Sequence, residues 1–490
     1  MKHLSFISLI VLLRIIPLYA QTNNNFDKYF IDATMRIDYF HIGNAKEEII
    51  TLDRIYKQGI WASSTTNPID TFGNGHYYAK IYDYTTNQMI FSKGYDSYFG
   101  EYKTTTAAIK GVKRTFHESV LIPYPKNTIQ LTIEVRDREN VLHQIFSQLI
   151  DPKDMYISQK SLEPGVKIIE LVKSGNPHEK ADIAIIAEGY TASEEQKFRS
   201  DAERLAKAFF DFEPYKSRKS KFNFYAVLKA SAESGVDEPS YGSFKNTVVN
   251  ATFDSLGSER YLLTEDNKSL RDIAAHVPYD ALMILVNTKR YGGGGLYNNY
   301  ATVTSDNQWT KYVFLHEFGH SFVGLADEYY TSSTAYNEFY PQGIEPIEPN
   351  ITALVDAGNF KWKDQCAPSI AIPTPWEKDA YDKMDNDYQK IRQEVNNKIA
   401  KLKREKAPES DIAKLQEESE KLSREHALKI DEFLTKSKFA GKVGVYEGAG
   451  YAAKGLYRPM IDCLMFTKGA KPFCKVCEHA VIQVIERYSR

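Results

Sequence analysis

The spacing of hydrophobic residues changes along this chain of 490 residues. From about residue 30 to 150, hydrophobic and polar residues alternate in short runs, which is the period of half-buried β-strands. The alternation is plainest at Ile129, Leu131, Ile133 and Val135. Several short strands without a strong helical pattern predict an N-terminal β-sandwich, which we place at residues 21–155.

A different pattern begins after residues 151–165, a segment rich in proline and charge that we expect to be a linker. Residues 183–187 form a continuous apolar run, as in a buried strand, and residues 191–210 carry apolar side chains at helical spacing. Further strands are expected at 222–227, 281–286 and 300–304. A mixed sheet with helices is therefore predicted for residues 165–490, which makes the whole chain α+β.

Residues 376–437 interrupt that pattern because they are rich in Lys, Glu, Gln and Leu. The segment Lys406–Ser410 contains Pro408 and divides them into two helical halves. An antiparallel helical hairpin is predicted. We expect a solvated insertion into the α/β region, and an arm that binds a partner protein is the alternative.

The net charge restricts the possible partners of the chain, and its N-terminal residues indicate its location. Lys and Arg total 62 against 64 Asp and Glu, so the net charge of -2 gives no basic field for nucleic acid. Residues 1–20 hold an early Lys2, an apolar run and Ala20 before a polar stretch, which predicts a signal peptide and a secreted or periplasmic protein. A buried N-terminal helix is the alternative. The first cysteine is Cys366, which excludes a lipid-anchor cysteine after the signal, and no transmembrane segment is expected in the mature chain.

The four cysteines lie late in the chain, at Cys366, Cys463, Cys474 and Cys477. In an exported protein four cysteines can pair in three ways. Cys474 and Cys477, followed by His479, also have the spacing of a metal site. Because no second such pair exists, disulfides or free thiols are the expectation.

The segment from Phe314 to Tyr330, FLHEFGHSFVGLADEYY, places His316 and His320 on one helix face. Both imidazoles can then bind one metal ion, with Glu317 beside it as a general base, which is the pattern of zinc hydrolases. A buried helix with incidental polar residues is the alternative, but it would leave three polar groups to satisfy. We expect the helix to start at a capping box, because a serine and a glutamine have that spacing, namely Ser305 and Gln308.

The third ligand follows from helix geometry. If the helix continued, Asp327 would lie about 10 Å beyond His320, too far for bonds near 2 Å. The helix must therefore stop, and Gly324 is the residue that can turn the chain back. Asp327 is the predicted ligand because its side chain is short. Glu328 is the alternative, either as the ligand or as a hydrogen-bond partner of a ligating histidine.

These residues resemble the signature of the IgA peptidase family, which comprises metzincin-like zinc metallopeptidases. The shared pattern is His316-Glu317-x-x-His320-x-x-x-Gly324-x-x-Asp327. Other segments resemble the family at residues 188–191, 231–237, 287–295 and 447–451. The resemblance covers residues 165–490, and the predicted β-sandwich resembles the family's N-terminal domain. One departure is that metzincins place the third ligand six residues after the second histidine, where this chain has Ala326.

The resemblance implies further roles. Met465, with Met460 as the alternative, is similar to the methionine that lies beneath the metal of metzincins. Gly293 and Gly294 fall in a segment, 291–304, similar to the edge strand that pairs with substrate. Tyr457 is a candidate for stabilising the transition state.

Together these features imply a secreted zinc endopeptidase with one catalytic Zn²⁺, in which Glu317 takes a proton from a zinc-activated water. Proteins or peptides would be the substrates, and the family resemblance alone points to immunoglobulin or other host glycoproteins. The alternative is an exported adhesin or binding protein with a structural or vestigial metal site. A structural zinc normally has four protein ligands, and the sequence offers no fourth.

Overall fold

The computed structural model describes residues 26–331 and 339–489. The predicted signal peptide, residues 1–20, lies outside the described residues. Among the helices that the structure describes, none is long and apolar enough to cross a membrane.

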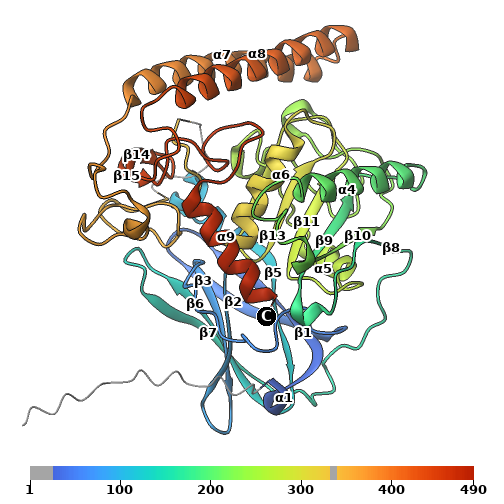
Figure 1. The fold of residues 1–490 in the computed structure, drawn as a ribbon. Helices are drawn as coiled ribbons and strands as arrows, with labels where there is room; N and C mark the ends of the chain where they lie inside the picture. The colour runs from blue at the N-terminus through green and yellow to red at the C-terminus, as the bar shows by residue number, and fades with distance from the viewer. Residues whose placement is uncertain (1–25, 332–338, 490) are drawn as a thin grey trace, which may run out of the picture.

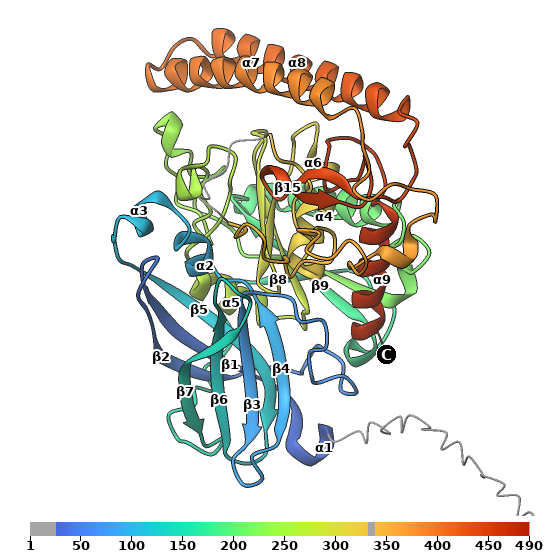
Figure 2. The same ribbon diagram turned by 90° about the vertical axis from the view of Figure 1, so that its left-hand side faces the viewer.

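The N-terminal region is rich in β-structure, as predicted. A short helix, α1 (Phe26–Tyr29), precedes two antiparallel sheets with strand orders β2-β1-β5 and β4-β3-β6-β7 (Figure 2). The strands are β1 (Phe30–Gly43), β2 (Glu48–Lys57), β3 (Tyr77–Asp83), β4 (Met89–Tyr95), β5 (Arg114–Pro125), β6 (Ile129–Arg136) and β7 (Leu142–Ile150). Ile37 of one sheet and Leu131 of the other are fully buried in a single core between the sheets.

A six-stranded sheet of order β12-β13-β11-β9-β10-β8 forms the centre of the C-terminal region (Figure 1). Its strands are β8 (Lys167–Val172), β9 (Ala181–Glu188), β10 (Phe222–Leu228), β11 (Ala281–Val286), β12 (Gly293–Leu296) and β13 (Tyr300–Thr304). The four central strands are parallel, and β8 and β12 are antiparallel edges. The predicted mixed α/β region is therefore confirmed. Every residue of β9, β10 and β11 is buried, because helices or aromatic side chains cover both faces.

The side chains of alternate residues in these strands point to opposite faces of the sheet and are buried in two different hydrophobic cores. One face packs against α4 (Glu195–Phe209), α6 (Thr310–Phe318) and α9 (Lys475–Tyr488). The other face packs against α5 (Asn267–Ala274) and against side chains of the N-terminal region, from α2 (Tyr98–Tyr102), α3 (Thr106–Ile109) and β5. The two regions therefore share a hydrophobic core.

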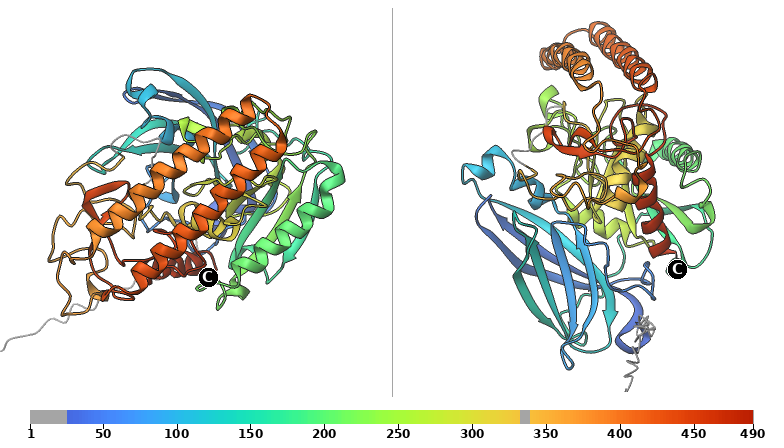
Figure 3. Two further views of the ribbon diagram at one scale, coloured as in Figure 1. Left: turned by 90° about the horizontal axis from the view of Figure 1, so that it is seen from above. Right: turned by 60° about the vertical axis from the view of Figure 1, so that its left-hand side comes forward.

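Two long helices, α7 (Lys378–Arg404) and α8 (Glu409–Thr435), lie side by side across one end of the molecule (Figures 1 and 3). We call residues 378–435 the α7–α8 arm. Tyr381, Ile430 and Leu434, at its inner end, are buried in the core that also holds α6. The arm is therefore anchored by its inner end. A two-stranded hairpin, β14 (Tyr446–Ala449) and β15 (Ala452–Arg458), follows it.

Candidate metal centre

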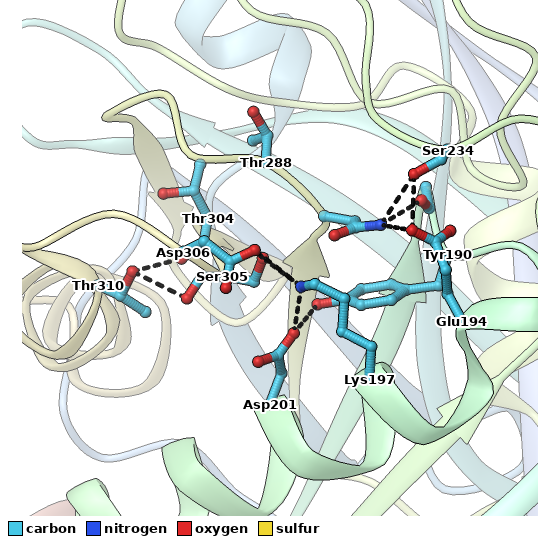
Figure 4. A network of polar contacts seen from close by, with 12 residues as sticks. Tyr190, Glu194, Lys197, Asp201, Ser234, Thr288, Thr304, Ser305, Asp306 and Thr310 are labelled. Atoms are coloured by element: carbon cyan, nitrogen blue, oxygen red, sulfur yellow. Dashed lines mark hydrogen bonds and ion pairs between the residues drawn. The ribbon is translucent and has the colours of Figure 1, made fainter. Parts of the chain in front are cut away.

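The helix that carries the histidine motif, α6, is fixed at its start by polar contacts. It begins at Thr310 without a side-chain cap at Trp309, so the predicted capping box is wrong. The Thr310 hydroxyl instead donates to the carbonyl of Thr304 at 2.8 Å, and Gln308 donates to a carbonyl of α8. Lys197 of α4 bridges Asp201 at 2.7 Å and Asp306 at 2.8 Å (Figure 4). The Lys197 bridge holds the segment before α6 against α4, and Gln308 holds it against α8.

The other end of α6 turns as the sequence predicts. Residues Gly319–Val323 widen into one π-helical turn, and Gly324 follows in a left-handed conformation with φ of 75°. The Gly324 N–H donates to the carbonyl of His320 at 2.9 Å, which closes the helix. The chain then returns towards the histidines. No feature of the sequence predicts the π-helical turn.

The turn brings three donor atoms together. His316 Nε2 lies 2.8 Å and His320 Nε2 lies 3.2 Å from Asp327 Oδ1, and the two Nε2 atoms are 3.1 Å apart. A tetrahedral ion with bonds near 2.05 Å requires donors about 3.3 Å apart. The three side chains therefore fit a zinc-like ion.

The atoms on the far side of each ligand are also fixed. His316 Nδ1 donates to the carbonyl of Leu464 at 3.1 Å, and His320 Nδ1 donates to the carbonyl of Leu325 at 2.6 Å. Because a carbonyl only accepts, each Nδ1 carries the proton of the neutral imidazole, and Nε2 is the nitrogen whose lone pair can bind a metal. The Tyr451 hydroxyl donates to Asp327 Oδ2.

The electrostatics of the centre favour a cation. Burial opposes ionisation of Asp327, but the two imidazoles hold its pKa well below its ordinary value. Burial would lower the pKa of His320, yet the Asp327 carboxylate outweighs it and raises that pKa to about 9. Burial raises the pKa of Glu317, while the imidazoles of His316 and His320 act in the opposite direction.

Glu328, the alternative ligand, points away from the histidines. Its Oε1 accepts from Asn350 Nδ2 at 3.1 Å and lies 3.1 Å from the Cys477 thiol. Burial raises the pKa of this carboxyl well above its ordinary value.

All four cysteines are free thiols in the structure, and His479 is exposed, away from the buried Cys474 and Cys477.

Met465 lies beneath the histidine helix. It is fully buried, and a Cβ placed on Gly319 would come within 3.0 Å of its sulfur. Its carbonyl accepts from the Glu328 N–H at 2.9 Å. The structure therefore brings Met465 under the turn that joins the ligands. Met460 is buried in the same core.

A cleft opens above the three ligands and Glu317, and the glycines of β12 form one wall. A Cβ on Gly293 would lie 3.0 Å from Glu317 Cγ, and one on Gly295 would lie 2.6 Å from the Glu317 carbonyl. Gly294, also in the wall, has Tyr261 at 2.7 Å from such a Cβ. Only glycines allow β12 to lie this close to α6.

Tyr457 is not among the residues that line the cleft. It lies on β15, where its backbone pairs with Thr352. Tyr291, Tyr312, Tyr329 and Tyr451 line the cleft instead.

Two family models match the chain. The one described as IgA Peptidase M64 matches residues 169–485, which is more than half of the chain, and the one described as Peptidase M64 N-terminus matches residues 25–147. The chain belongs to the IgA peptidase M64 family. The suspected family and its N-terminal domain are therefore confirmed, and this M64 protein is a metallopeptidase whose substrates are proteins or peptides. No curated protein matches it.

The sequence did not single out three residues that shape the centre of this M64 peptidase. Asn350 is fully buried and holds Ala326 through both backbone groups, at 2.8 and 2.9 Å. Arg260 faces the cleft and donates to the Tyr329 hydroxyl at 3.0 Å. Tyr451 had a signal, because it ends one of the segments that resemble the family. Asn350 and Arg260 lie in segments without a motif.

Proposed function

We propose that this M64 peptidase is a secreted, zinc-dependent endopeptidase with a metzincin-like catalytic domain. The observation that carries the proposal is the triangle of His316 Nε2, His320 Nε2 and Asp327 Oδ1 on the floor of a cleft, with Glu317 beside it. Imidazole and carboxylate donors at these separations suit zinc. When bound, zinc would supply a Lewis acid that activates water and polarises a peptide carbonyl.

The chain's own residues would perform the proton transfers. Glu317 accepts a proton from the attacking water at its carboxylate and passes it to the leaving amine. Its partly exposed side chain lines the cleft next to β12. Arg260, which lines the cleft beside β12, offers a cation that can stabilise negative charge on the carbonyl oxygen, the role first expected of Tyr457.

The edge strand β12 would align the substrate backbone. At Gly293 this edge is already covered, because Gly293 exchanges hydrogen bonds with Arg260 and Leu262 at 3.3 and 3.1 Å. The Tyr297 carbonyl accepts from Asp96 at 2.8 Å. A substrate strand is therefore expected to pair between these two contacts, at Gly295. Met465 would support the ligands from below, as the methionine of metzincins does.

The proposal extends to location and domains. Residues 1–20 would be removed on export, residues 21–155 would form the N-terminal β-sandwich domain, and residues 165–490 the catalytic domain, with 376–437 as a helical hairpin insertion. The family's description names IgA, so immunoglobulins and other host glycoproteins are the proposed substrate class.

The test compares Glu317→Gln with the wild type on a labelled peptide pool. We expect the variant to bind zinc normally, as measured by elemental analysis, and to cleave peptides at least 100-fold more slowly, because a general base contributes about 10²- to 10⁴-fold. The matched control is Glu203→Gln, on the exposed surface of α4, which should cleave normally. A zinc-loaded wild type that cleaves no peptide would support the adhesin alternative. A fully active Glu317→Gln would instead show that Glu317 is not the general base.

A further inference from the structure

A second group of buried metal-binding side chains lies on the other side of the Asp327 segment. It comprises Glu328, Cys463, Cys474 and Cys477, whose donor atoms all lie within 4.8 Å of one another. Each of the four residues is at most 3% exposed. They come from three segments: the return from Gly324, the loop that contains Met465, and the first turn of α9.

The separations suit an ion better than a disulfide. Cys463 Sγ and Cys477 Sγ are 3.8 Å apart, whereas a disulfide requires about 2.05 Å. Zinc bonds of about 2.3 Å to sulfur place two tetrahedral ligands about 3.8 Å apart. Glu328 Oε1 lies 3.1 Å from Cys477 Sγ and 3.9 Å from Cys474 Sγ.

Backbone N–H groups surround the sulfurs. Cys463 Sγ accepts from the N–H of Met465 at 3.4 Å and of Cys474 at 3.2 Å. Cys474 Sγ, at the N-cap of the 14-residue helix α9, accepts from the N–H of Cys477 at 3.5 Å. Such donors, together with the positive end of a helix dipole, stabilise the thiolate form that binds metal.

One oxygen in the cluster has no partner in the described structure. Glu328 is fully buried, and its Oε2 makes no hydrogen bond with any described residue. The buried Arg458 donates to the carbonyls of Glu447 and Gly448 and forms no ion pair with Glu328 in the described part of the chain. Ionising a buried carboxyl without a cation beside it is costly, and a metal ion at the centre of the pocket would offset that cost.

We propose that Cys463, Cys474, Cys477 and Glu328 bind a second divalent cation of the zinc class. Four protein ligands close the coordination, so the site is structural and leaves no position for water or substrate. The ion would tie the start of α9 to the loop of Met465 and to the residue next to Asp327. It would therefore position Asp327 and Leu464, whose carbonyl holds His316.

Cobalt substitution of the full chain tests this proposal. Co²⁺ bound by thiolates has a sulfur-to-metal charge-transfer absorption that histidine and carboxylate ligands lack. The wild type should bind two Co²⁺ per chain and show this band. The double variant His316→Ala, His320→Ala should bind one Co²⁺ and keep the band in full, which separates the second site from the catalytic one.

Variants of the cysteines complete the test. Cys477→Ser should lose the band and one ion, whereas the matched control Cys366→Ser should keep both, because Cys366 lies outside the cluster. If Cys477→Ser does not fold, the double histidine variant decides alone. Absence of the band in that variant overturns the proposal. So does a titration of the unfolded, metal-free chain that finds two free thiols rather than four, because the missing pair would be a disulfide.

Discussion

At the residue scale, the two oxygens of Asp327 have different partners. Oδ1 faces both imidazoles, and Oδ2 accepts from the Tyr451 hydroxyl. Tyr451 comes from the turn between β14 and β15, whose Gly450 N–H donates to the Asp327 carbonyl at 2.9 Å. The spacing of His316, Gly324 and Asp327 predicts that Asp327 is a metal ligand. Tyr451, which binds its second oxygen, lies 124 residues further along the chain, so this contact depends on the fold and could not be predicted from spacing.

We predict that Tyr451→Phe weakens metal binding about 10- to 100-fold, because the Asp327 carboxylate loses the donor that orients it. A competition titration with a zinc chelator measures the affinity. Tyr457→Phe is the matched control, because this tyrosine lies outside the cleft, and it should bind zinc like the wild type. Equal affinity of Tyr451→Phe and wild type would contradict the prediction.

At the element scale, a pair of carboxyls joins the starts of the central strands. Asp182 of β9 is fully buried, accepts from Asn223 of β10 at 2.8 Å, and donates its N–H to Asp280, which precedes β11, at 2.9 Å. Burial, and then the charge of Asp280, raise the pKa of Asp182 above its ordinary value of 3.8. The folded chain therefore keeps a proton that the unfolded chain releases.

We predict that the free energy of unfolding falls as the pH rises from about 4 towards neutral, because the unfolded chain then binds fewer protons at Asp182 than the folded chain. One such group contributes a slope of about 1.4 kcal/mol per pH unit. Asp182→Asn should flatten the profile in urea unfolding at several pH values. Asp211→Asn, on the surface, is the control and should leave the slope unchanged. An unchanged slope in Asp182→Asn would refute this assignment.

The α7–α8 arm shows which elements the sequence could predict. The strands around Ile183, Ala281 and Tyr300 lie where hydrophobic runs predict them, since local pattern and burial agree. The arm's role could not be predicted, because its composition is that of a solvated helix pair. Its inner halves nevertheless line the cleft, through Tyr388 of α7 and His426 of α8, which stack at 3.9 Å.

We predict that removing residues 397–416 and closing the gap with a short glycine linker leaves a folded, active peptidase. The removed part contacts the body through a few partly exposed groups, such as Lys403, which lies 3.8 Å from Glu238. Removing 377–436 should instead abolish activity, because it takes away Tyr388, His426 and the buried Leu434. Thermal unfolding and peptide cleavage measure both. Full activity of the larger deletion would show that the arm is dispensable to the cleft.

At the scale of the whole molecule, the N-terminal region is part of the peptidase body. Phe99 and Phe116 are buried in the core behind the six-stranded sheet. Asp96 and Glu101 line the cleft, and the Asn298 side chain donates to the Gly94 carbonyl at 2.8 Å. The spacing of hydrophobic residues predicted two separate regions. This spacing indicates which residues are buried, but it does not indicate which part of the chain covers them.

We predict a single cooperative thermal transition for the chain, with equal calorimetric and van't Hoff enthalpies, because neither region completes its core alone. A chain that begins at residue 165 should aggregate, since it exposes the face of the sheet that the N-terminal aromatic side chains cover. Two resolved transitions in differential scanning calorimetry, or a monomeric folded chain from residue 165, would contradict this expectation.

Asp327 and Glu328 are neighbours in the sequence, and their side chains point to opposite sides of the same backbone segment. Asp327 faces the histidines, and Glu328 faces the cysteines. Inserting or deleting one residue after Gly324 would exchange these faces and put the wrong side chain into each cluster. During evolution, this segment can therefore vary by substitution at Leu325 or Ala326, but its length from the helix end to Glu328 must stay constant in any homologue that keeps both clusters.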